Sequence, residues 1–259
     1  MEIIRIKSLS GYINAIKKIK DGAIENGKEA WFRGVSNENY ELVPGTVWRN
    51  IKENVHTGII EEWQNEYLLY SNEELQDGFD IYALAQHYGL PTRLLDWTVS
   101  PLIALYFSLE KEEIKDKRVV WAIDPIALNK KMTDWDGHLS VSDRFLRKEH
   151  NLDNYLPESF SGNDKSELMT GPISIRVQPR NKRIISQKGC FTIHGTSAES
   201  VDKVLEDIPY SIVKMEIYGK KTRDKILNEL YLLGVSEDSV FQDLNAFSSR
   251  LKRTWGLNS

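Results

Sequence analysis

The feature that most constrains the fold is a short helical segment, residues 102–109, that is apolar on nearly every side. Ser100 precedes it as a helix N-cap, and Pro101 takes the first helical position. A helix without a polar face has to be covered by other elements on all sides. The chain therefore needs a layered core around this segment. Its 259 residues, 41% of them hydrophobic, suffice for a single domain with such a core.

Apolar periodicity predicts both helices and strands along the rest of the chain. The expected helices are one that Ser8 or Ser10 caps and Asp21-Gly22 ends, then residues 63–70, 81–88 and 222–233, and a last helix capped by Ser236 with a stripe of Val240, Leu244, Phe247 and Leu251. The expected strands are residues 29–33, 118–123, 173–177 and 214–218, with a hairpin over 183–194 that turns at Lys188-Gly189.

These elements predict one α+β domain over residues 1–259, with helices early and late and its core at about residues 29–252. Residues 130–171 are polar and contain Asp-Gly, Ser-Gly and Asn-Asp pairs. We expect a long loop or a small insertion there.

The net charge of −4 argues against a protein that coats nucleic acid over its whole surface. One tract is locally basic, however, with no acidic residue between its cations: Arg176, Arg180, Lys182, Arg183 and Lys188. Such a tract predicts a surface that binds the phosphates of RNA or DNA, although a solvated face of the protein is the commoner explanation.

Several classes of protein are not indicated. The single cysteine, Cys190, excludes an internal disulfide and a thiolate metal cluster, and the five histidines lack the spacing of metal ligands, so we expect no metal. No apolar run has membrane-spanning length, and the N-terminus does not resemble a signal peptide. We expect a cytoplasmic protein with no membrane partner.

The first candidate site residue is Arg33, at the end of an apolar strand and just before Gly34. A guanidinium at a sheet end, where glycine lets a ligand approach the backbone, suits phosphate or carboxylate. The alternative is a structural ion pair with Asp96 or a nearby glutamate.

A second candidate is the turn over residues 91–98, which leads into the apolar helix. Arg93, Asp96, Trp97 and Thr98 lie together there, so an anion and a stacked heterocycle can be held beside free helix amides. Alternatively, Arg93 and Asp96 pair with each other and Trp97 belongs to the core.

Two further residues are weaker candidates. Gln187 precedes the predicted Lys-Gly turn, but most glutamines on a hairpin are simply solvated. His87 lies on the helix that enters the turn over residues 91–98, where a satisfied histidine at a helix end is the alternative.

Taken together, the motifs resemble the FRG domain family. They are Phe32-Arg33-Gly34, residues 86–98 (QHYGLPTRLLDWT) followed by Pro101, Ala104 and Phe107, residues 183–191 (RIISQKGCF) and residues 240–244 (VFQDL). The family is largely uncharacterised, so this resemblance implies a fold and little chemistry.

A fainter resemblance, to ADP-ribosyltransferases of the Arg-Ser-Glu type, implies a split β-sheet with flanking helices and NAD as substrate. It gives catalytic roles to Arg33, Asp96, Thr98 and Gln187, and NAD-binding roles to Phe32, Gly34, His87, Arg93 and Trp97. Two departures matter: Asp-Trp replaces Ser-Thr, and Gln187 stands where the family has its catalytic glutamate.

The resemblance favours an ADP-ribosyltransferase acting as a toxin or phage-defence effector, with RNA or DNA ahead of protein as acceptor and an antitoxin or regulatory protein as a further partner. The alternative is an inactive module of the same fold that senses a nucleotide or nucleic acid. A nuclease would need a carboxylate cluster or a general-base histidine that this spacing does not supply.

Overall fold

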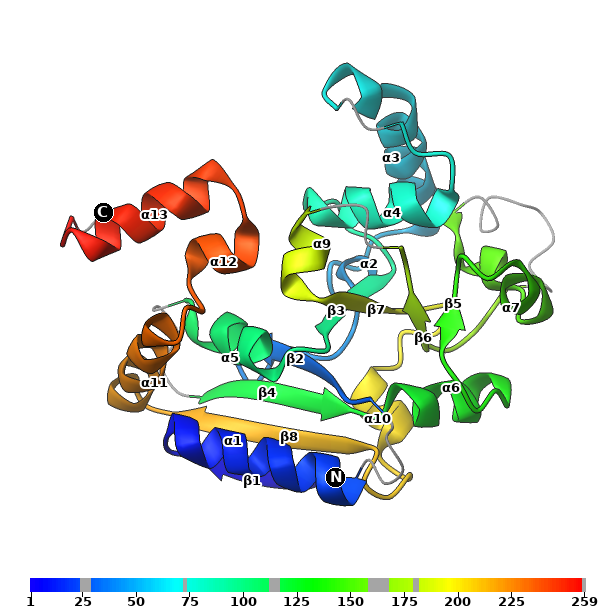
Figure 1. Cartoon of the computed structure of the whole chain (residues 1–259). Coiled ribbons are helices and arrows are strands. Elements are labelled where there is room, and N and C mark those ends of the chain that lie inside the picture. The colour runs from blue at the N-terminus through cyan, green and yellow to red at the C-terminus, as the bar shows by residue number, and fades with distance from the viewer. Residues whose placement is uncertain (24–28, 72–73, 112–116, 158–167, 179–181, 258–259) are drawn as a thin grey trace.

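The computed structural model describes the whole chain except residues 24–28, 72–73, 112–116, 158–167, 179–181 and 258–259, together with the side chains of residues 22, 23 and 183. In this described part, eight strands form one open sheet in the order β1-β8-β4-β2-β3-β7-β6-β5 (Figure 1). The strands are β1 (Glu2–Ile6), β2 (Trp31–Val35), β3 (Leu94–Thr98), β4 (Lys117–Ile123), β5 (Leu139–Ser140), β6 (Ile173–Arg176), β7 (Gly189–Ile193) and β8 (Ile212–Tyr218).

The sheet consists of two halves that are joined weakly at its centre. Strand β2 pairs with β4 along its whole length, and β3 pairs with β7 in the same way. Between β2 and β3 the register comprises a single pair, Phe32 with Thr98. The two halves therefore diverge from this point, and the α+β class expected from the sequence is confirmed.

Helices cover both halves of the sheet (Figure 1). The longer ones are α1 (Leu9–Lys18), α3 (Glu53–Glu66), α4 (Gly78–His87), α5 (Pro101–Leu109), α6 (Pro125–Thr133), α11 (Lys220–Leu232) and α13 (Leu244–Thr254). The shorter ones are α2 (Gly45–Trp48), α7 (Arg144–Glu149), α9 (Lys182–Gln187), α10 (Val201–Leu205) and α12 (Glu237–Phe241).

Three hydrophobic clusters form the core. Helices α1, α5 and α11 pack on one face of the half formed by β1, β8, β4 and β2. Helices α6 and α10 contribute to a cluster with Trp31, Trp97 and Trp121. Helices α3 and α4 pack with β6, β7 and residues 139–156.

Helix α5 is the buried helix that its sequence requires. Ala104, Leu105 and Leu109 are fully inaccessible to solvent. The helix lies so close to β2 that a Cβ on Gly34 would stand 1.8 Å from the carbonyl oxygen of Ala104. A side chain at position 34 is therefore excluded by helix packing, so the glycine serves the close approach of α5 rather than that of a ligand.

Two local predictions near the candidate site are wrong. The segment over residues 91–98 is not only a turn, because Leu94–Thr98 form strand β3 in the centre of the sheet. The hairpin over 183–194 is instead helix α9 followed by strand β7. Lys188 joins them with a left-handed backbone, φ 48°. Alternation of apolar residues over so short a span fits a helical turn as well as a strand.

Residues 130–171 are more ordered than a long loop in the part that the structure describes. They include β5, α7 and a 3-10 turn at Leu152–Tyr155. Leu139, Leu152 and Tyr155 are buried in the core. Polar composition conceals these anchors because they are spaced widely along the segment.

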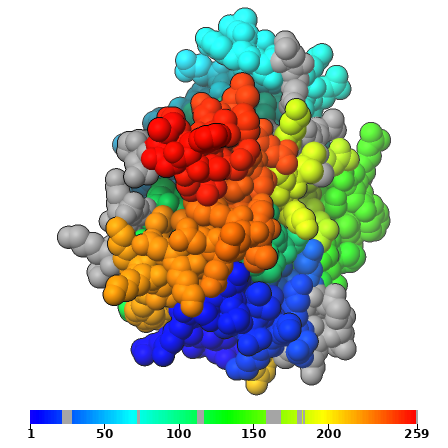
Figure 2. Space-filling model, turned by 60° about the vertical axis from the view of Figure 1, so that its left-hand side comes forward, coloured from blue at the N-terminus to red at the C-terminus, as the bar shows by residue number. Residues whose placement is uncertain are grey.

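The C-terminal stripe belongs to two helices rather than one. Gln242, with φ 51°, ends α12, and the side chain of Asp243 caps α13. Val240 is buried, whereas Leu244 is 80% exposed. The C-terminal segment, red in Figure 2, lies on the surface beside the yellow α9 segment, and Ser186 of α9 donates a hydrogen bond to the carbonyl of Val240 at 2.9 Å.

Candidate functional site

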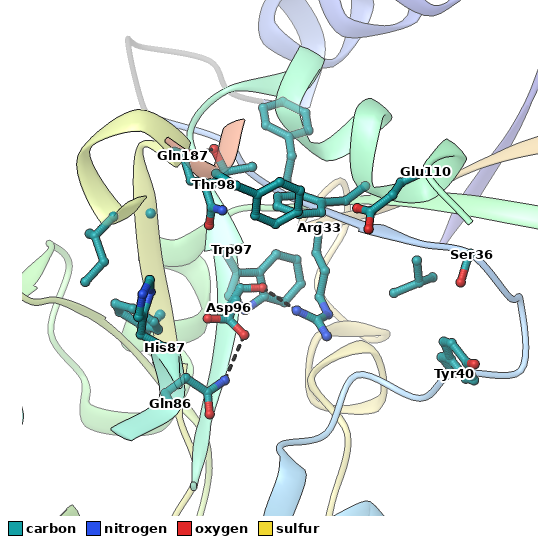
Figure 3. A pocket seen from close by; sticks show the side chains of 18 of the residues that line it. Arg33, Ser36, Tyr40, Gln86, His87, Asp96, Trp97, Thr98, Glu110 and Gln187 are labelled. Carbon is teal, nitrogen blue, oxygen red and sulfur yellow. Dashed lines mark hydrogen bonds between the residues drawn. The ribbon is translucent and has the colours of Figure 1, made fainter. Parts of the chain in front are cut away.

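A cavity of about 380 Å³ opens where the two halves of the sheet diverge. Its walls come from β2, α4, β3, α5, α9 and α12, segments that are far apart in the sequence. A volume of this size lies within the range of small-molecule sites, about 300–1,000 Å³. Figure 3 shows the cavity with the side chains that line it.

Most of the residues predicted from the sequence line this one cavity. They are Phe32, Arg33, Gly34, His87, Asp96, Trp97, Thr98 and Gln187. They lie on four different elements, so the convergence is a property of the tertiary fold. These residues differ, however, in whether their side chains point into the cavity or are bound elsewhere in the protein.

Arg33 crosses the gap between the two halves. Its Nη1 donates a hydrogen bond to the main-chain carbonyl of Asp96 at 2.7 Å (Figure 3). Its Nε is buried and has no hydrogen-bond partner among the described residues. Burial lowers the pKa of Arg33, and the Asp96 carboxylate opposes this shift. An arginine stays charged under any such change, so the cavity contains a cation whose hydrogen bonds are not all satisfied.

The Asp96 carboxylate is held from the side of α4. Gln86 Nε2 donates a hydrogen bond to Asp96 Oδ2 at 2.7 Å, shown dashed in Figure 3. The hydroxyl of Thr92 in turn donates to Gln86 Oε1 at 2.6 Å. Asp96 therefore contacts Arg33 through its backbone and not through its carboxylate, and the predicted alternative of a side-chain ion pair between the two is wrong.

Thr98 and Gln187 form a second contact across the site. Thr98 Oγ1 donates to the main-chain carbonyl of Gln187 at 2.6 Å and accepts a hydrogen bond from the Ser100 amide at 2.9 Å. Thr98 is buried, and its hydroxyl is used within the protein. The hydroxyl of Thr98 therefore links β3 to the end of α9.

The side chain of Gln187 is directed into the cavity from the end of α9 (Figure 3). Its Nε2 is buried without a hydrogen-bond partner in the described part of the chain. This amide is the second unsatisfied donor of the cavity, after Arg33 Nε.

Trp97 and Arg93 do not present their side chains to the cavity. The Trp97 side chain is 3% exposed and packs in the core, where its Nε1 donates to Thr192 Oγ1 at 3.1 Å. Successive strand residues point to opposite faces, so a tryptophan next to Asp96 faces away from it. Trp97 is therefore not a stacking platform for a ligand.

Arg93 lies outside the cavity and forms an ion pair with Glu53 of α3. Its Nη1 also donates to the carbonyl of Gly195 at 2.6 Å. The partner is thus neither a ligand nor Asp96, as the sequence suggested, but a carboxylate that lies 40 residues away.

The sequence analysis missed several lining residues. Gln86, Phe107 and Phe241 belonged to the FRG motifs but had no assigned role. Tyr40 and Glu110 lay outside these motifs. Phe107 and Phe241 lie edge to face with ring centroids 5.8 Å apart. Tyr40 is half exposed at the cavity. These rings, not Trp97, supply the aromatic surface.

The predicted nucleic-acid residues are only partly described. Lys182 and Lys188 are exposed at the two ends of α9. Arg180 and the side chain of Arg183 lie outside the described residues. In the described part, no group of three or more His, Cys, Asp or Glu side chains is placed to hold a metal ion, and no helix there has both the length and the apolar character to cross a bilayer.

Comparison with known proteins gives one family match. The model of the FRG domain matches residues 28–117, which contain β2, α4, β3 and α5 and hence Arg33, Gln86 and Asp96. The FRG resemblance is thereby confirmed for this part of the chain. No curated protein and no solved structure matches the chain.

Proposed function

The chain carries an FRG domain at residues 28–117, and from this premise we propose that the cavity binds NAD and that the protein transfers ADP-ribose to a macromolecule. Nucleic acid is the favoured acceptor, ahead of protein. In this proposal the protein is a cytoplasmic toxin or phage-defence effector that an antitoxin or regulatory protein restrains.

One observation carries the proposal: two buried donors, Arg33 Nε and Gln187 Nε2, meet in one cavity without partners among the described residues. Of the eleven buried side-chain atoms without a hydrogen-bond partner in the described part, these two belong to residues that line the cavity, and an unsatisfied buried donor costs about 1–3 kcal/mol, which a ligand oxygen would relieve. A ligand rich in acceptor oxygens satisfies both donors. The pyrophosphate and ribose oxygens of NAD fit this requirement, because a guanidinium binds phosphate in a charge-assisted way.

In the reaction the protein has to bind the pyrophosphate, stabilise the charge on the sugar while removing a proton from the acceptor, and orient the sugar. The bond between nicotinamide and ribose C1′ breaks with its electron pair leaving on nicotinamide, while an acceptor nucleophile bonds to C1′ and gives up a proton. Arg33 binds the pyrophosphate, and Gln187 donates a hydrogen bond to a sugar oxygen. The Asp96 carboxylate stabilises the positive charge on the sugar and accepts the proton that the nucleophile gives up. Tyr40 and the pair Phe107 and Phe241 provide aromatic contacts for the bases.

The acceptor is favoured to be nucleic acid because α9 carries exposed cations beside the cavity. Lys182 and Lys188 flank the helix whose last residue is Gln187. Phosphates bound there would bring a base amino group near the sugar. Such a nucleophile needs less activation than a hydroxyl does, which suits a site with a neutral glutamine.

A second candidate is a sensor that binds NAD or a related nucleotide without turnover. The neutral amide at position 187 favours it, because a glutamine can hydrogen-bond a ribose hydroxyl but supplies neither negative charge nor a base. The same cavity and the same cation serve both functions. They differ in whether nicotinamide leaves.

The test is incubation of the full chain with NAD labelled in its adenine part, in the presence of RNA, single-stranded DNA or total protein. Transfer predicts free nicotinamide and a labelled macromolecule. The isosteric variant Asp96→Asn should still bind NAD, with an affinity lowered no more than about tenfold when measured by calorimetry, and should lose at least about 100-fold in transfer, the range for removal of a key electrostatic group.

A matched control is Asp143→Asn, which changes the helix-capping aspartate of α7 outside the cavity. It should leave transfer unchanged. Binding of NAD without release of nicotinamide supports the sensor, and the absence of NAD binding contradicts both candidates.

A further inference from the structure

A directed chain of hydrogen bonds reaches the Asp96 carboxylate from the protein interior. The amide of Leu94 donates to Thr92 Oγ1 at 3.1 Å, so this hydroxyl oxygen serves as an acceptor. Its single proton then goes to Gln86 Oε1 at 2.6 Å. Because Oε1 is fixed as the acceptor, the amide of Gln86 has to present its N–H groups on the other side.

The N–H groups of Gln86 are directed at β3. One contact, from Nε2 to Asp96 Oδ2, measures 2.7 Å, and another, to the carbonyl of Leu94, measures 3.5 Å. A group that donates to Asp96 Oδ2 favours the ionised carboxylate over the protonated one. It also fixes the plane of the carboxylate, whose Oδ1 has no hydrogen-bond partner among the residues described.

The cavity therefore offers two kinds of polar group. Arg33 Nε and Gln187 Nε2 are donors and suit the oxygens of a phosphate or a sugar. Asp96 Oδ1 is an acceptor and suits a group that carries a proton. Of the groups on a phosphorylated sugar, the hydroxyls are the donors.

We propose that Gln86 is a positioning residue, set by Thr92, that fixes the Asp96 carboxylate so that its Oδ1 accepts a hydrogen bond from a sugar hydroxyl of the ligand. This inference rests on the proposed function in that it takes a nucleotide sugar as the ligand. It does not require turnover.

The chain of hydrogen bonds also joins α4 to β3, and a purely structural staple would look the same in one structure. Thr92 separates the two roles, because it is fully buried and does not line the cavity. Thr92→Val keeps the shape and removes the hydroxyl, so the amide of Gln86 is no longer oriented. Thr92→Ser restores the hydroxyl and with it the orientation.

Gln86→Glu tests the next link. It keeps the shape but brings a carboxylate against Asp96 Oδ2, where the two negative charges repel each other. The matched control is Thr57→Val, which removes another buried hydroxyl, one that donates to the carbonyl of Glu53 in α3, away from the cavity.

Two probes distinguish the acceptor from the donors of the cavity: ADP-ribose has sugar hydroxyls, and inorganic pyrophosphate has none. Calorimetry should show that Thr92→Val and Gln86→Glu weaken ADP-ribose binding about tenfold, the loss of one hydrogen bond to a charged group. Thr92→Ser and Thr57→Val should bind it like the wild type. Pyrophosphate should bind equally to the wild type, Thr92→Val, Thr92→Ser and Thr57→Val, and more weakly to Gln86→Glu, whose added carboxylate repels any anion in the cavity.

Unchanged ADP-ribose affinity in folded Thr92→Val and Gln86→Glu overturns the proposal. Equal weakening of both probes in Thr92→Val also overturns it, because this variant adds no charge and the cavity as a whole has then changed. Binding of neither probe to the wild type contradicts the proposed function instead.

In that last case hydrogen exchange of the Gln86 side-chain amide, followed by NMR, still decides whether the chain of hydrogen bonds exists. Slow exchange in the wild type and Thr92→Ser, with fast exchange in Thr92→Val, supports it. Fast exchange in the wild type overturns it.

Discussion

Two arginines beside β3 have opposite surroundings. Arg93, just before the strand, is paired with Glu53 and with the carbonyl of Gly195, outside the cavity. Arg33 reaches the middle of the strand, contacts a main-chain carbonyl and lines the cavity, with no carboxylate within ion-pair distance among the described residues. The comparison teaches that residue type and sequence context do not show which arginine is ion-paired. The fold decides this by supplying a carboxylate partner to Arg93 and a main-chain carbonyl to Arg33.

The largest effect should come from breaking the paired arginine. Arg93→Met leaves the Glu53 carboxylate without its partner, and loss of one member of a buried pair costs about 3–5 kcal/mol. Urea unfolding should show a decrease in the free energy of unfolding near the low end, because the Glu53 side chain is 31% exposed. The double variant Glu53→Leu/Arg93→Met should recover part of this loss. A loss below about 1 kcal/mol would mean that Arg93 is not the structural member of the comparison.

The unpaired arginine should show the reverse pattern. Arg33→Met removes the cation of the cavity, and we expect NAD affinity to fall about 100-fold, as for loss of charge-assisted hydrogen bonds. The free energy of unfolding should change by less than about 1 kcal/mol, because loss of the hydrogen bond to the Asp96 carbonyl is offset by removal of a buried donor without a partner among the described residues. Calorimetry and urea unfolding on the same sample measure both quantities. A stability loss like that of Arg93→Met with unchanged affinity would remove the contrast between the two residues.

A pH dependence sharpens the description of the Arg93 region. His194 is fully buried, and burial together with the nearby Arg93 charge lowers its pKa to about 3. Above pH 6.5 His194 is neutral in both the folded and the unfolded state, so it does not lower the free energy of unfolding. Between pH 6.5 and about 3 His194 is protonated only in the unfolded state, so the free energy of unfolding falls by about 1.4 kcal/mol for each unit by which the pH is lowered.

The matched variant for this effect is His194→Leu. Urea unfolding at pH 7.5 and pH 5.5 should give it a smaller decrease in stability than the wild type, by about 1.4 kcal/mol. His56, whose pKa is lowered to about 4 by the same two causes, contributes a similar slope in both proteins. Identical decreases in the two proteins would show that His194 accepts a proton in the folded state.

The smallest effect concerns the exposed cations beside the Arg33 cavity. Lys182→Ala/Lys188→Ala should weaken RNA binding about threefold to tenfold and reduce its salt dependence, since each phosphate contact contributes to the slope. NAD affinity should stay the same. Fluorescence anisotropy at two salt concentrations measures the change. An unaltered salt dependence would show that Lys182 and Lys188 do not contact RNA phosphates.

Local patterns predicted much of the fold. Ser8 caps α1, and α5 begins at Pro101 after Ser100. The strand predicted over residues 29–33 is present as β2, but it begins at Trp31 and continues through Gly34 to Val35, so Arg33 lies in its middle and not at its end. Strand β1, at the edge of the sheet, was not predicted, because residues 2–6 alternate too weakly when charged side chains face solvent. Strand β3 was not predicted either, because the charged Asp96, whose side chain lines the cavity, interrupts its apolar residues.

The candidate site was predicted in part. Arg33, Asp96 and Gln187 were expected to converge, and they line one cavity. Trp97 was assigned to the wrong face because a turn was expected where a strand stands, and the alternation of a strand turns neighbours to opposite sides. Gln86 could not be assigned, because its role depends on the proton of Thr92 six residues away.

The sequence by itself determined what needs only neighbours: the caps, the fully apolar helix that had to be buried, and the FRG motifs. Only the tertiary structure decided which polar groups meet which partners. Hydrogen bonds and ion pairs act over a few ångströms between residues that stand far apart in the sequence, 102 positions in the case of Arg93 and Gly195. No local pattern carries that distance, so the fold alone separates an arginine that is paired with a carboxylate from one that contacts a main-chain carbonyl.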